Sequence, residues 1–342
     1  MTAIEIDPSE QLIRLPRERR RPRLGNHPFD TAASPDPTLA RQLDLDGDVV
    51  SYVGSPRMER RLINARGFVP TPEAVVDLMV ASLFAARPPT EDSRVLDPGC
   101  GPGAFIDGIV RWCRRHRAPI PRITGIELDR GRADHAATRF RANETIEIVR
   151  RDFLMTSRDR FDYIIGNPPY VSIYSFSEAE KAAYRAEYAT ARGRFDLYLL
   201  FFEQALRLLQ PNGRLVFITP EKFLYVKTAE PLRRILARLA LREVRLVDEE
   251  TFGSLVTYPA ITTVDNALPF GHTKIVLRDH TTREIQFPDD GASALPLLNG
   301  HTARNDGPTL DDVCRRVSCG VGLDGSRGML LRRHPSRAVS RP

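Results

Sequence analysis

Apolar positions recur at helical and strand spacing from residue 67 to residue 268. They predict a helix beginning at Thr71, which caps it, with Pro72 in the first helical position. Short apolar runs predict seven strands, at residues 94–96, 123–126, 146–149, 161–165, 214–218, 244–247 and 260–264. Amphipathic segments predict helices between them, around 105–112, after Glu127, and at 196–209 and 229–239. The alternation predicts an α/β, Rossmann-like fold: a mostly parallel seven-stranded sheet with helices on both faces.

The pattern also divides the chain. Residues 1–65 are rich in Arg, Pro and Asp without sustained periodicity, and predict a largely disordered arm with one short ordered stretch at 49–53. Residues 66–268 carry the α/β pattern and predict the catalytic domain. Residues 269–342 are a shorter region that runs into an arginine-rich tail.

Composition adds little to this picture. The 342 residues carry a formal net charge of +6, which suits a polyanionic partner and equally suits arginine-rich coding sequence. No apolar run approaches the roughly 20 residues that span a bilayer, and the N-terminus lacks a signal-peptide core, so we expect a cytoplasmic protein away from membranes. The four cysteines include no second pair at zinc spacing, so we expect reduced thiols and no metal site.

A glycine-rich turn follows the first predicted strand. It reads Asp97-Pro-Gly-Cys-Gly-Pro-Gly, with Gly99, Gly101 and Gly103 free to adopt positive φ and to let a ligand approach the backbone. The dinucleotide spacing Gly-x-Gly-x-x-Gly is absent, and Asp97 would repel a pyrophosphate. An acid there favours a cationic ligand, such as the sulfonium cofactor S-adenosylmethionine with its amino group.

Two further acids end the next strands. Glu127 follows the second strand and is placed to accept both ribose hydroxyls. Asp152 follows the third and can accept from an adenine amino group, while Phe153 packs on the adenine face. Separately, Glu127 is as readily a solvated strand end and Phe153 a core residue. Three acids ending three consecutive strands favour a cofactor site at the carboxyl edge of the sheet.

The most specific motif is Asn167-Pro168-Pro169-Tyr170, after the fourth strand. Two prolines fix an extended turn and remove two N–H donors, leaving the Asn167 side chain and the Pro168 carbonyl as acceptors. Accepting both N–H groups of an aromatic amine would favour its nucleophilic form, and Tyr170 offers a flat face to a flipped base. The methyl group would then transfer by direct in-line displacement, without a covalent enzyme intermediate. Phe252 is a candidate second wall for the base, or a core aromatic.

Together these motifs resemble the gamma-class amino-methyltransferases, most closely the Taq-type adenine-N6 DNA methyltransferases of restriction-modification systems. The resemblance covers roughly residues 60–268 and rests on 68–77, 97–105, 152–153 and 167–170. It implies a site-specific, adenine-specific DNA methyltransferase that uses S-adenosylmethionine. In that family, Thr71 would contribute to the methionine end of the cofactor, and Asp97, Glu127, Asp152 and Phe153 would hold the rest. Asn167, Pro168 and Tyr170, with Phe252 a weaker match, would hold the target base.

The sequence departs from that family at its C-terminus. Residues 317–324 resemble the opening of a DNA-recognition domain, and an arginine-rich tail follows. We therefore expect a truncated recognition region, or recognition of double-stranded DNA with help from a separate recognition or restriction subunit. Two alternatives stay open: a methyltransferase acting on an RNA base or a protein glutamine amide, and a catalytically weak remnant that binds DNA or a partner.

Overall fold

A computed structural model describes residues 69–155, 159–248 and 258–298. The predicted arm with its stretch at 49–53, Phe252, and the tail from residue 299 onward lie outside the described residues. Within the described ranges no helix is long and apolar enough to cross a membrane.

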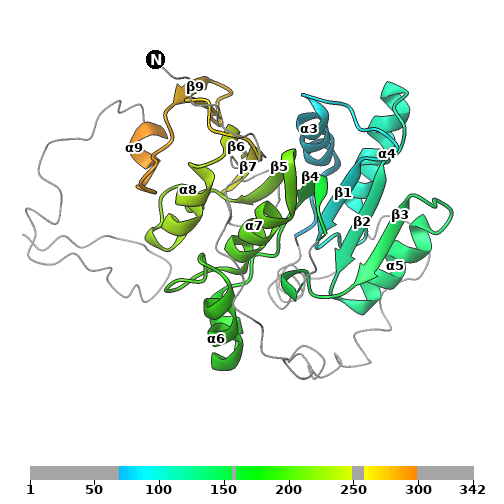
Figure 1. Ribbon diagram of the computed structural model, residues 1–342, viewed down its shortest axis with the longest axis horizontal. Helices are drawn as coiled ribbons and strands as arrows, with labels where there is room; N and C mark the ends of the chain where they lie inside the picture. Colours follow the sequence, from blue (N-terminus) through cyan, green and yellow to red (C-terminus); the bar gives the residue numbers. More distant parts are fainter. Residues whose placement is uncertain (1–68, 156–158, 249–257, 299–342) are drawn as a thin grey trace, which may run out of the picture. The chain divides into compact units, whose positions relative to one another are not determined.

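One sheet of nine strands organises the domain, in the order β3-β2-β1-β4-β5-β7-β6-β8-β9 (Figure 1). The first five strands of that order are mutually parallel, and β7 runs antiparallel between β5 and β6. The strands are β1 (Arg94–Pro98), β2 (Arg122–Glu127), β3 (Ile146–Arg150), β4 (Phe161–Gly166), β5 (Leu209–Pro220), β6 (Ala240–Leu246), β7 (Pro259–Asp265), β8 (Thr273–Val276) and β9 (Thr282–Ile285). The chain steps outward from β1 to β3 and then returns to β4 beside β1, so the switch point at which such sheets bind ligands lies between β1 and β4.

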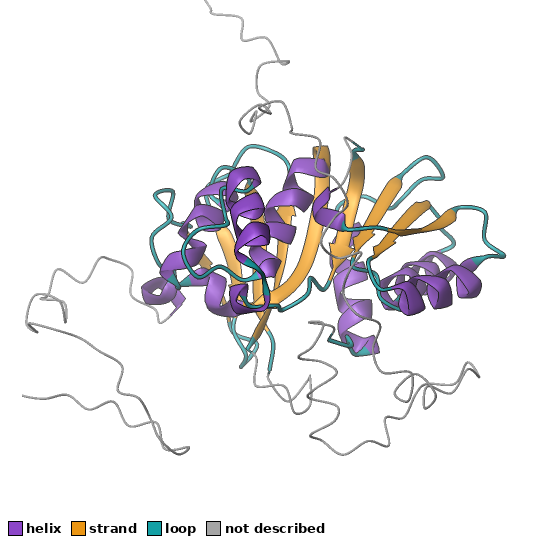
Figure 2. Cartoon of the chain, turned by 90° about the horizontal axis from the view of Figure 1, so that it is seen from below, coloured by secondary structure: helices purple, strands orange, loops and turns teal. Residues whose placement is uncertain are grey.

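Helices cover both faces of this sheet (Figure 2). The helices of the described residues are α3 (Glu73–Phe84), α4 (Ala104–His116), α5 (Arg130–Phe140), α6 (Glu178–Glu187), α7 (Leu197–Leu208), α8 (Glu230–Leu236) and the short α9 (Leu295–Leu298). Residues of α3, α4 and α5 share one buried apolar cluster with Val216 and Ile218 of β5. Phe217, which alternation turns to the other face, packs against Phe202 of α7 with 5.3 Å between ring centroids. The α/β class and the mostly parallel sheet are confirmed.

The sheet is larger than the seven strands that the sequence predicts. Beyond residue 268, β8 pairs parallel with β6, and β9 pairs antiparallel with β8 and ends the sheet. These two strands were missed because they are short and carry exposed polar residues on one face, so no apolar run marks them. The sheet therefore extends into the region that the sequence assigns to DNA recognition.

The start of α3 also differs from the prediction. Pro72, not Thr71, is the N-cap residue, and the Pro72 carbonyl accepts from the backbone N–H groups of Val75 and Val76. Thr71 does not cap the helix with its side chain, because its hydroxyl accepts a hydrogen bond from Asn167 instead. A residue that looks like a helix cap is used to join the first helix to β4.

Helix α6 was missed in the sequence. Its residues are mostly polar, but Ser177 and Glu180 form a complete capping box, in which each side chain bonds the other residue's backbone N–H. The Ser-x-x-Glu spacing is the signal that could have located this helix.

Candidate active site

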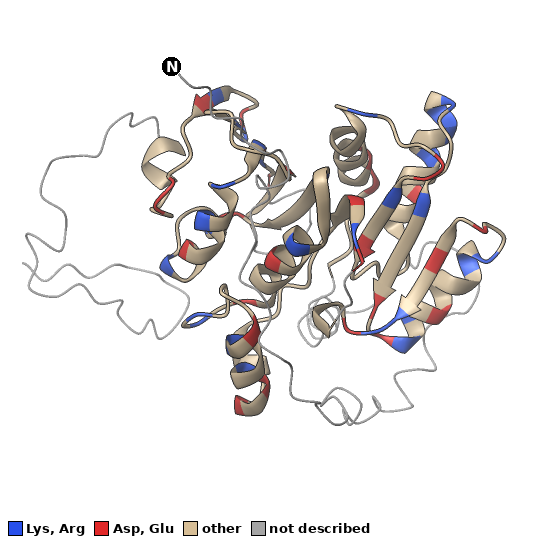
Figure 3. Ribbon diagram, in the orientation of Figure 1, with Lys and Arg blue, Asp and Glu red and all other residues tan. Residues whose placement is uncertain are grey.

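The predicted site residues gather at one edge of the sheet, at the carboxyl ends of β1, β2 and β4. Asp97 lies opposite Gly125 of β2, and Glu127 is the last residue of β2. Figure 3 shows acidic residues at the arrowhead ends of β1 and β2. Because β4 runs parallel beside β1, Asn167 leaves the sheet at the same edge.

The glycine-rich turn takes the conformation that only glycine adopts readily. Gly99, Gly101 and Gly103 have φ of 81°, 56° and 96°. The backbone N–H groups of Gly99 and Cys100 both donate to the Ile126 carbonyl, at 2.7 and 2.9 Å. The turn is thus fastened to the end of β2, with its backbone facing the edge of the sheet.

Replacing Gly103 with alanine is expected to destabilise the domain by about 2–5 kcal/mol. A left-handed φ costs a non-glycine residue about 1–2 kcal/mol, and overpacking a core costs about 1–3 kcal/mol. Both terms apply, because a Cβ on Gly103 would lie 2.3 Å from a ring carbon of Phe140. Urea unfolding of Gly103→Ala measures the loss. Gly131→Ala is the matched control, since that glycine lies in α5 with no contact closer than 3.5 Å and should be neutral or slightly stabilising. Equal stability of Gly103→Ala and Gly131→Ala would contradict the requirement for glycine at position 103.

Asp97 is fully buried, and neither of its carboxyl oxygens has a hydrogen-bond partner among the described residues. Burial, and secondarily the nearby Glu127 carboxylate, raise the pKa of Asp97 well above its usual value. A buried acid without a partner is costly to the fold, so it indicates a ligand that supplies the missing positive charge or donors.

Glu127 is tied to the glycine turn. One carboxylate oxygen accepts from the backbone N–H of Gly101 at 2.9 Å, and the other accepts from the N–H of Asp129 at 2.7 Å. The guanidinium of Arg132 forms an ion pair with that second oxygen at 3.0 Å. The carboxylate is 5% exposed and held in one orientation, with lone pairs left to accept further donors.

Asp152 and Phe153 follow β3. One oxygen of Asp152 accepts from the backbone N–H of Leu154 at 2.9 Å, which shapes the short turn that carries Phe153. Phe153 is buried, and its ring packs 5.0 Å from that of Phe201 in α7. The adenine-stacking role of Phe153 stays a prediction.

The Asn167 side chain has one end anchored and one end open. Its amide nitrogen donates to the Val69 carbonyl and to the Thr71 hydroxyl, both at 3.1 Å. Both donor positions are thereby used, and the Val69 carbonyl can only accept, so the amide cannot turn over without losing that hydrogen bond. The amide oxygen is buried and has no hydrogen-bond partner among the described residues. The fold therefore presents an acceptor, and not a donor, at the end of β4.

The rest of the motif continues along the same edge. Pro168 is buried, and Pro169 is half-buried. The Tyr170 hydroxyl donates to the Ile218 carbonyl of β5 at 3.3 Å, and burial raises the pKa of Tyr170. Burial therefore favours the neutral phenol of Tyr170, and the hydrogen bond to β5 holds its ring in one orientation.

Two contributors to this site escaped the sequence-based interpretation. Val69 anchors the Asn167 amide through a backbone carbonyl, which no side-chain pattern reveals. Gly166 precedes Asn167, and a Cβ there would lie 3.2 Å from a carboxyl oxygen of Asp97. This close approach places the Asp97 carboxyl group beside Gly166, and Gly166 directly precedes Asn167 with its open amide oxygen.

The fold and the site at the carboxyl ends of β1, β2 and β4 define the class of protein. A switch-point site with a glycine turn and an acid at the end of β1 lies on the fold of the S-adenosylmethionine-dependent methyltransferases. At this level the chain is similar to a class I S-adenosylmethionine-dependent methyltransferase from Listeria monocytogenes (16% identity, TM-score 0.51, covering 68% of this chain and 70% of that one). It is also similar to a type I restriction-modification methyltransferase subunit from Streptococcus thermophilus (18% identity, TM-score 0.53, 76% and 60%). These likenesses show the fold.

The sequence is similar to a narrower group of proteins. Residues 121–251 match the family model described as Eco57I restriction-modification methylase. The chain is 31% identical over 266 residues to the type II methyltransferase M.PaeR7I of Pseudomonas aeruginosa, covering 69% of this chain and 46% of that protein. It is 36% identical over 148 residues to M.XhoI of Xanthomonas vasicola, covering 41% and 27%. The chain is thus a relative of the restriction-modification methyltransferases, and it spans about a quarter to a half of the length of the first relatives that it matches.

The cofactor that this fold and these relatives imply is S-adenosylmethionine. The donor set fits it: a buried carboxylate that lacks a partner suits the cationic amino group, and the glycine turn leaves room for close backbone approach. Asp97, Glu127, Asp152 and Phe153 are the residues that would hold it.

Proposed function

We propose that this protein transfers a methyl group from S-adenosylmethionine to the N6 amino group of adenine in DNA. The single observation that carries the proposal is the orientation of Asn167. Its nitrogen is bonded twice within the protein, and its buried oxygen is left open beside the residue that contacts Asp97.

An open acceptor is what an aromatic amine needs. The lone pair of an adenine amino group is delocalised into the ring, so the amine is a weak nucleophile. When the Asn167 oxygen and the Pro168 carbonyl accept its two N–H groups, the nitrogen pyramidalises and its lone pair becomes available. A fixed acceptor does this without reorganising during the reaction, since the two anchors from Val69 and Thr71 already hold the amide.

The cofactor supplies an electrophilic methyl group on a sulfonium. The amine nitrogen forms its bond to the methyl carbon as the carbon–sulfur bond breaks, and the extra proton on nitrogen leaves to water. Asp97 would bind the positive amino group of the cofactor, Glu127 would accept from its ribose hydroxyls, and Asp152 would accept from its adenine. A Cβ added to Gly166 would lie 3.2 Å from a carboxyl oxygen of Asp97, so the two half-sites adjoin and positioning can contribute to the rate.

DNA is favoured as the substrate for two reasons. The relatives at about 30% identity are type II methyltransferases and a modification methylase. The neutral, fixed ring of Tyr170 offers a flat surface next to the acceptor, where a base rotated out of the duplex can stack. We therefore propose double-stranded DNA as the partner, with base flipping before methyl transfer.

The test is methyl transfer from tritiated S-adenosylmethionine to duplex DNA, to RNA and to a protein extract, followed by nucleoside and amino-acid analysis. We expect label in DNA as N6-methyladenine, and about 10²–10³-fold slower labelling with Asn167→Ala. Label in RNA or protein alone, or in DNA as a methylated cytosine, would overturn the adenine assignment. Isothermal calorimetry with the cofactor separates a failure to bind it from a failure to use it.

A further inference from the structure

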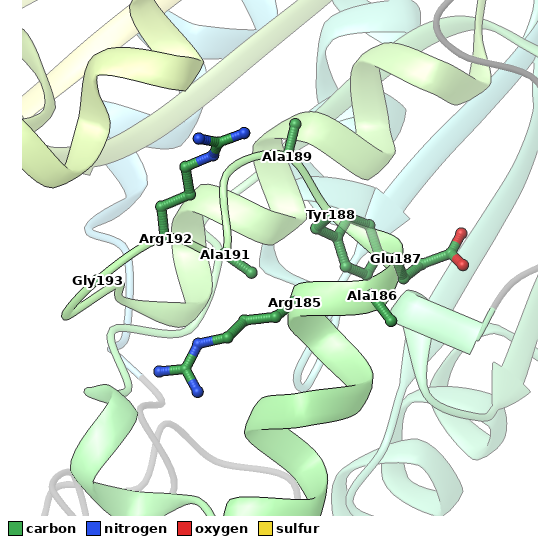
Figure 4. A pocket seen from close by; sticks show the side chains of 8 residues that line it. All are labelled: Arg185, Ala186, Glu187, Tyr188, Ala189, Ala191, Arg192 and Gly193. Atoms are coloured by element: carbon green, nitrogen blue, oxygen red, sulfur yellow. The ribbon is translucent and has the colours of Figure 1, made fainter.

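An open cavity of about 480 Å³ lies outside the site just described, at the C-terminal end of α6. It is formed by the last turn of α6 and the loop that leads to α7 (Figure 4). Arg185 and Arg192 line it, and Arg194 follows in the same loop. We call Arg185, Arg192 and Arg194 the arginine cluster.

The arginine cluster carries uncompensated charge. All three side chains are exposed, and none forms an ion pair with any residue that the structure describes. The nearby acids are already paired: Glu187 with Arg207 at 3.4 Å, Glu178 with Lys181 at 2.8 Å, and Asp196 with Lys222 at 2.5 Å. Figure 4 shows the Glu187 carboxylate on the far side of the Tyr188 ring from both labelled arginines. Three exposed arginines without ion-pair partners on one short segment give it a local excess of positive charge, so this surface favours an anionic ligand.

The loop is joined to the chain that leaves the candidate active site. The backbone N–H of Leu197 donates to the Val171 carbonyl at 2.8 Å, and the N–H of Ile173 donates to the Phe195 carbonyl at 3.2 Å. Ser172 and Asp196 form an antiparallel bridge between these contacts. Val171 directly follows Tyr170, so Arg194 lies one residue from the strand-like pairing that continues the Asn167–Tyr170 motif. The cluster is thus built onto the same edge as the proposed base-binding residues.

We propose that the arginine cluster binds backbone phosphates of the DNA strand that carries the target base. The proposal rests on the proposed function and adds the surface that holds the strand while one base leaves the stack. Guanidinium groups suit this task, because their planar donors match two phosphate oxygens at once. The Arg185 guanidinium carbon lies 6.0 Å from the centre of the Phe195 ring, which limits the motion of one member before DNA arrives.

The test compares two triple variants with the same loss of charge. The first is Arg185→Gln, Arg192→Gln and Arg194→Gln. The matched control is Arg114→Gln, Arg141→Gln and Arg238→Gln, three exposed arginines near the helix ends at the opposite edge of the sheet. Binding of a fluorescein-labelled DNA duplex is measured by anisotropy across a salt series, after thermal melting shows that both variants are folded.

Each phosphate contact adds about 0.9 to the slope of log Kd against log salt. We expect the cluster variant to lose about two to three units of that slope and to bind at least tenfold more weakly near physiological salt. The control should keep the wild-type slope and lie within twofold of the wild-type Kd. With methyl transfer as readout, the cluster variant should raise KM for DNA and leave the affinity for S-adenosylmethionine unchanged.

An unchanged slope in the cluster variant, or an equal loss in both variants, would overturn the proposal, because general charge and not a local contact would then explain binding. The proposal also fails if wild-type protein does not bind the duplex. Cluster-dependent DNA binding without methyl transfer would instead refute the proposed function and leave this inference standing.

Discussion

Asn167→Ala should lower kcat for methyl transfer by about 10²–10³, the size of effect seen when one fixed polar group is removed from a transition-state site. The variant loses the buried acceptor that the fold leaves open at the end of β4. Cofactor affinity should change little, because Asn167 follows β4 and is not on the strands that carry Asp97 and Glu127. Single-turnover transfer and calorimetry measure the two quantities separately.

Two variants of Thr71 serve as its controls. Thr71→Ser keeps the hydroxyl that accepts from the Asn167 nitrogen and should retain near wild-type kcat. Thr71→Val removes that anchor but leaves the Val69 carbonyl, and should reduce kcat by a smaller factor than Asn167→Ala. Thr71 is thus a positioning residue, and an equal kcat in Thr71→Ser and Thr71→Val would contradict that role. Full activity in Asn167→Ala would remove the basis of the proposed mechanism.

Asp97→Asn should weaken S-adenosylmethionine binding while it stabilises the ligand-free protein. Losing one member of a buried charge pair costs about 2–5 kcal/mol, which corresponds to a loss of affinity of at least about thirtyfold. Without ligand the opposite holds, since a fully buried carboxylate with no partner costs more than a neutral amide of the same size, by about 1–2 kcal/mol. Calorimetry and urea unfolding give the two numbers.

The pH dependence of this stability difference has a definite sign. Burial raises the pKa of Asp97 in the folded state above its value of about 3.9 in the unfolded chain. The protonated acid therefore favours folding below about pH 4, and that contribution is lost as pH rises through the folded pKa. Asp97→Asn and wild type should have similar stabilities near pH 4, and the variant should gain its advantage as the pH is raised. A variant that is less stable than wild type at pH 8 would show that Asp97 has an unrecognised structural partner.

The sequence predicts the sheet well where strands are apolar on both faces, and less well elsewhere. All seven predicted strands are present, because each contains the apolar residues that a sheet covered by helices must bury. The sequence does not predict the strands β8 and β9, because they are short and contain exposed polar residues. It does not predict the helix α6 either, because the residues of that helix are mostly polar.

At the site, the sequence predicts which residues meet but not how they are bonded. Parallel strands bring their carboxyl ends together, so the spacing of Asp97, Glu127 and Asn167 along the chain is enough to place them at one edge. The sequence does not predict the hydrogen bond from Asn167 to Thr71, because Thr71 before Pro72 also satisfies the local rules for a helix cap. A local preference was overridden by a contact across the fold. The roles of the site residues stay predictions until the variants above are measured.

The bond between Asn167 and Thr71 joins residues that are 96 positions apart. Its consequence is that catalytic competence belongs to the closed fold and to no single segment. The motif Asn167–Tyr170 carries the acceptor, but the direction in which that acceptor points is set by a short stretch before α3 that folds against it from the other end of the domain. When residues 69–72 detach, the Asn167 amide loses its hydrogen bonds to Val69 and Thr71 and can rotate to present its nitrogen to the substrate. On the proposed mechanism, methyl transfer should therefore be lost before the sheet unfolds.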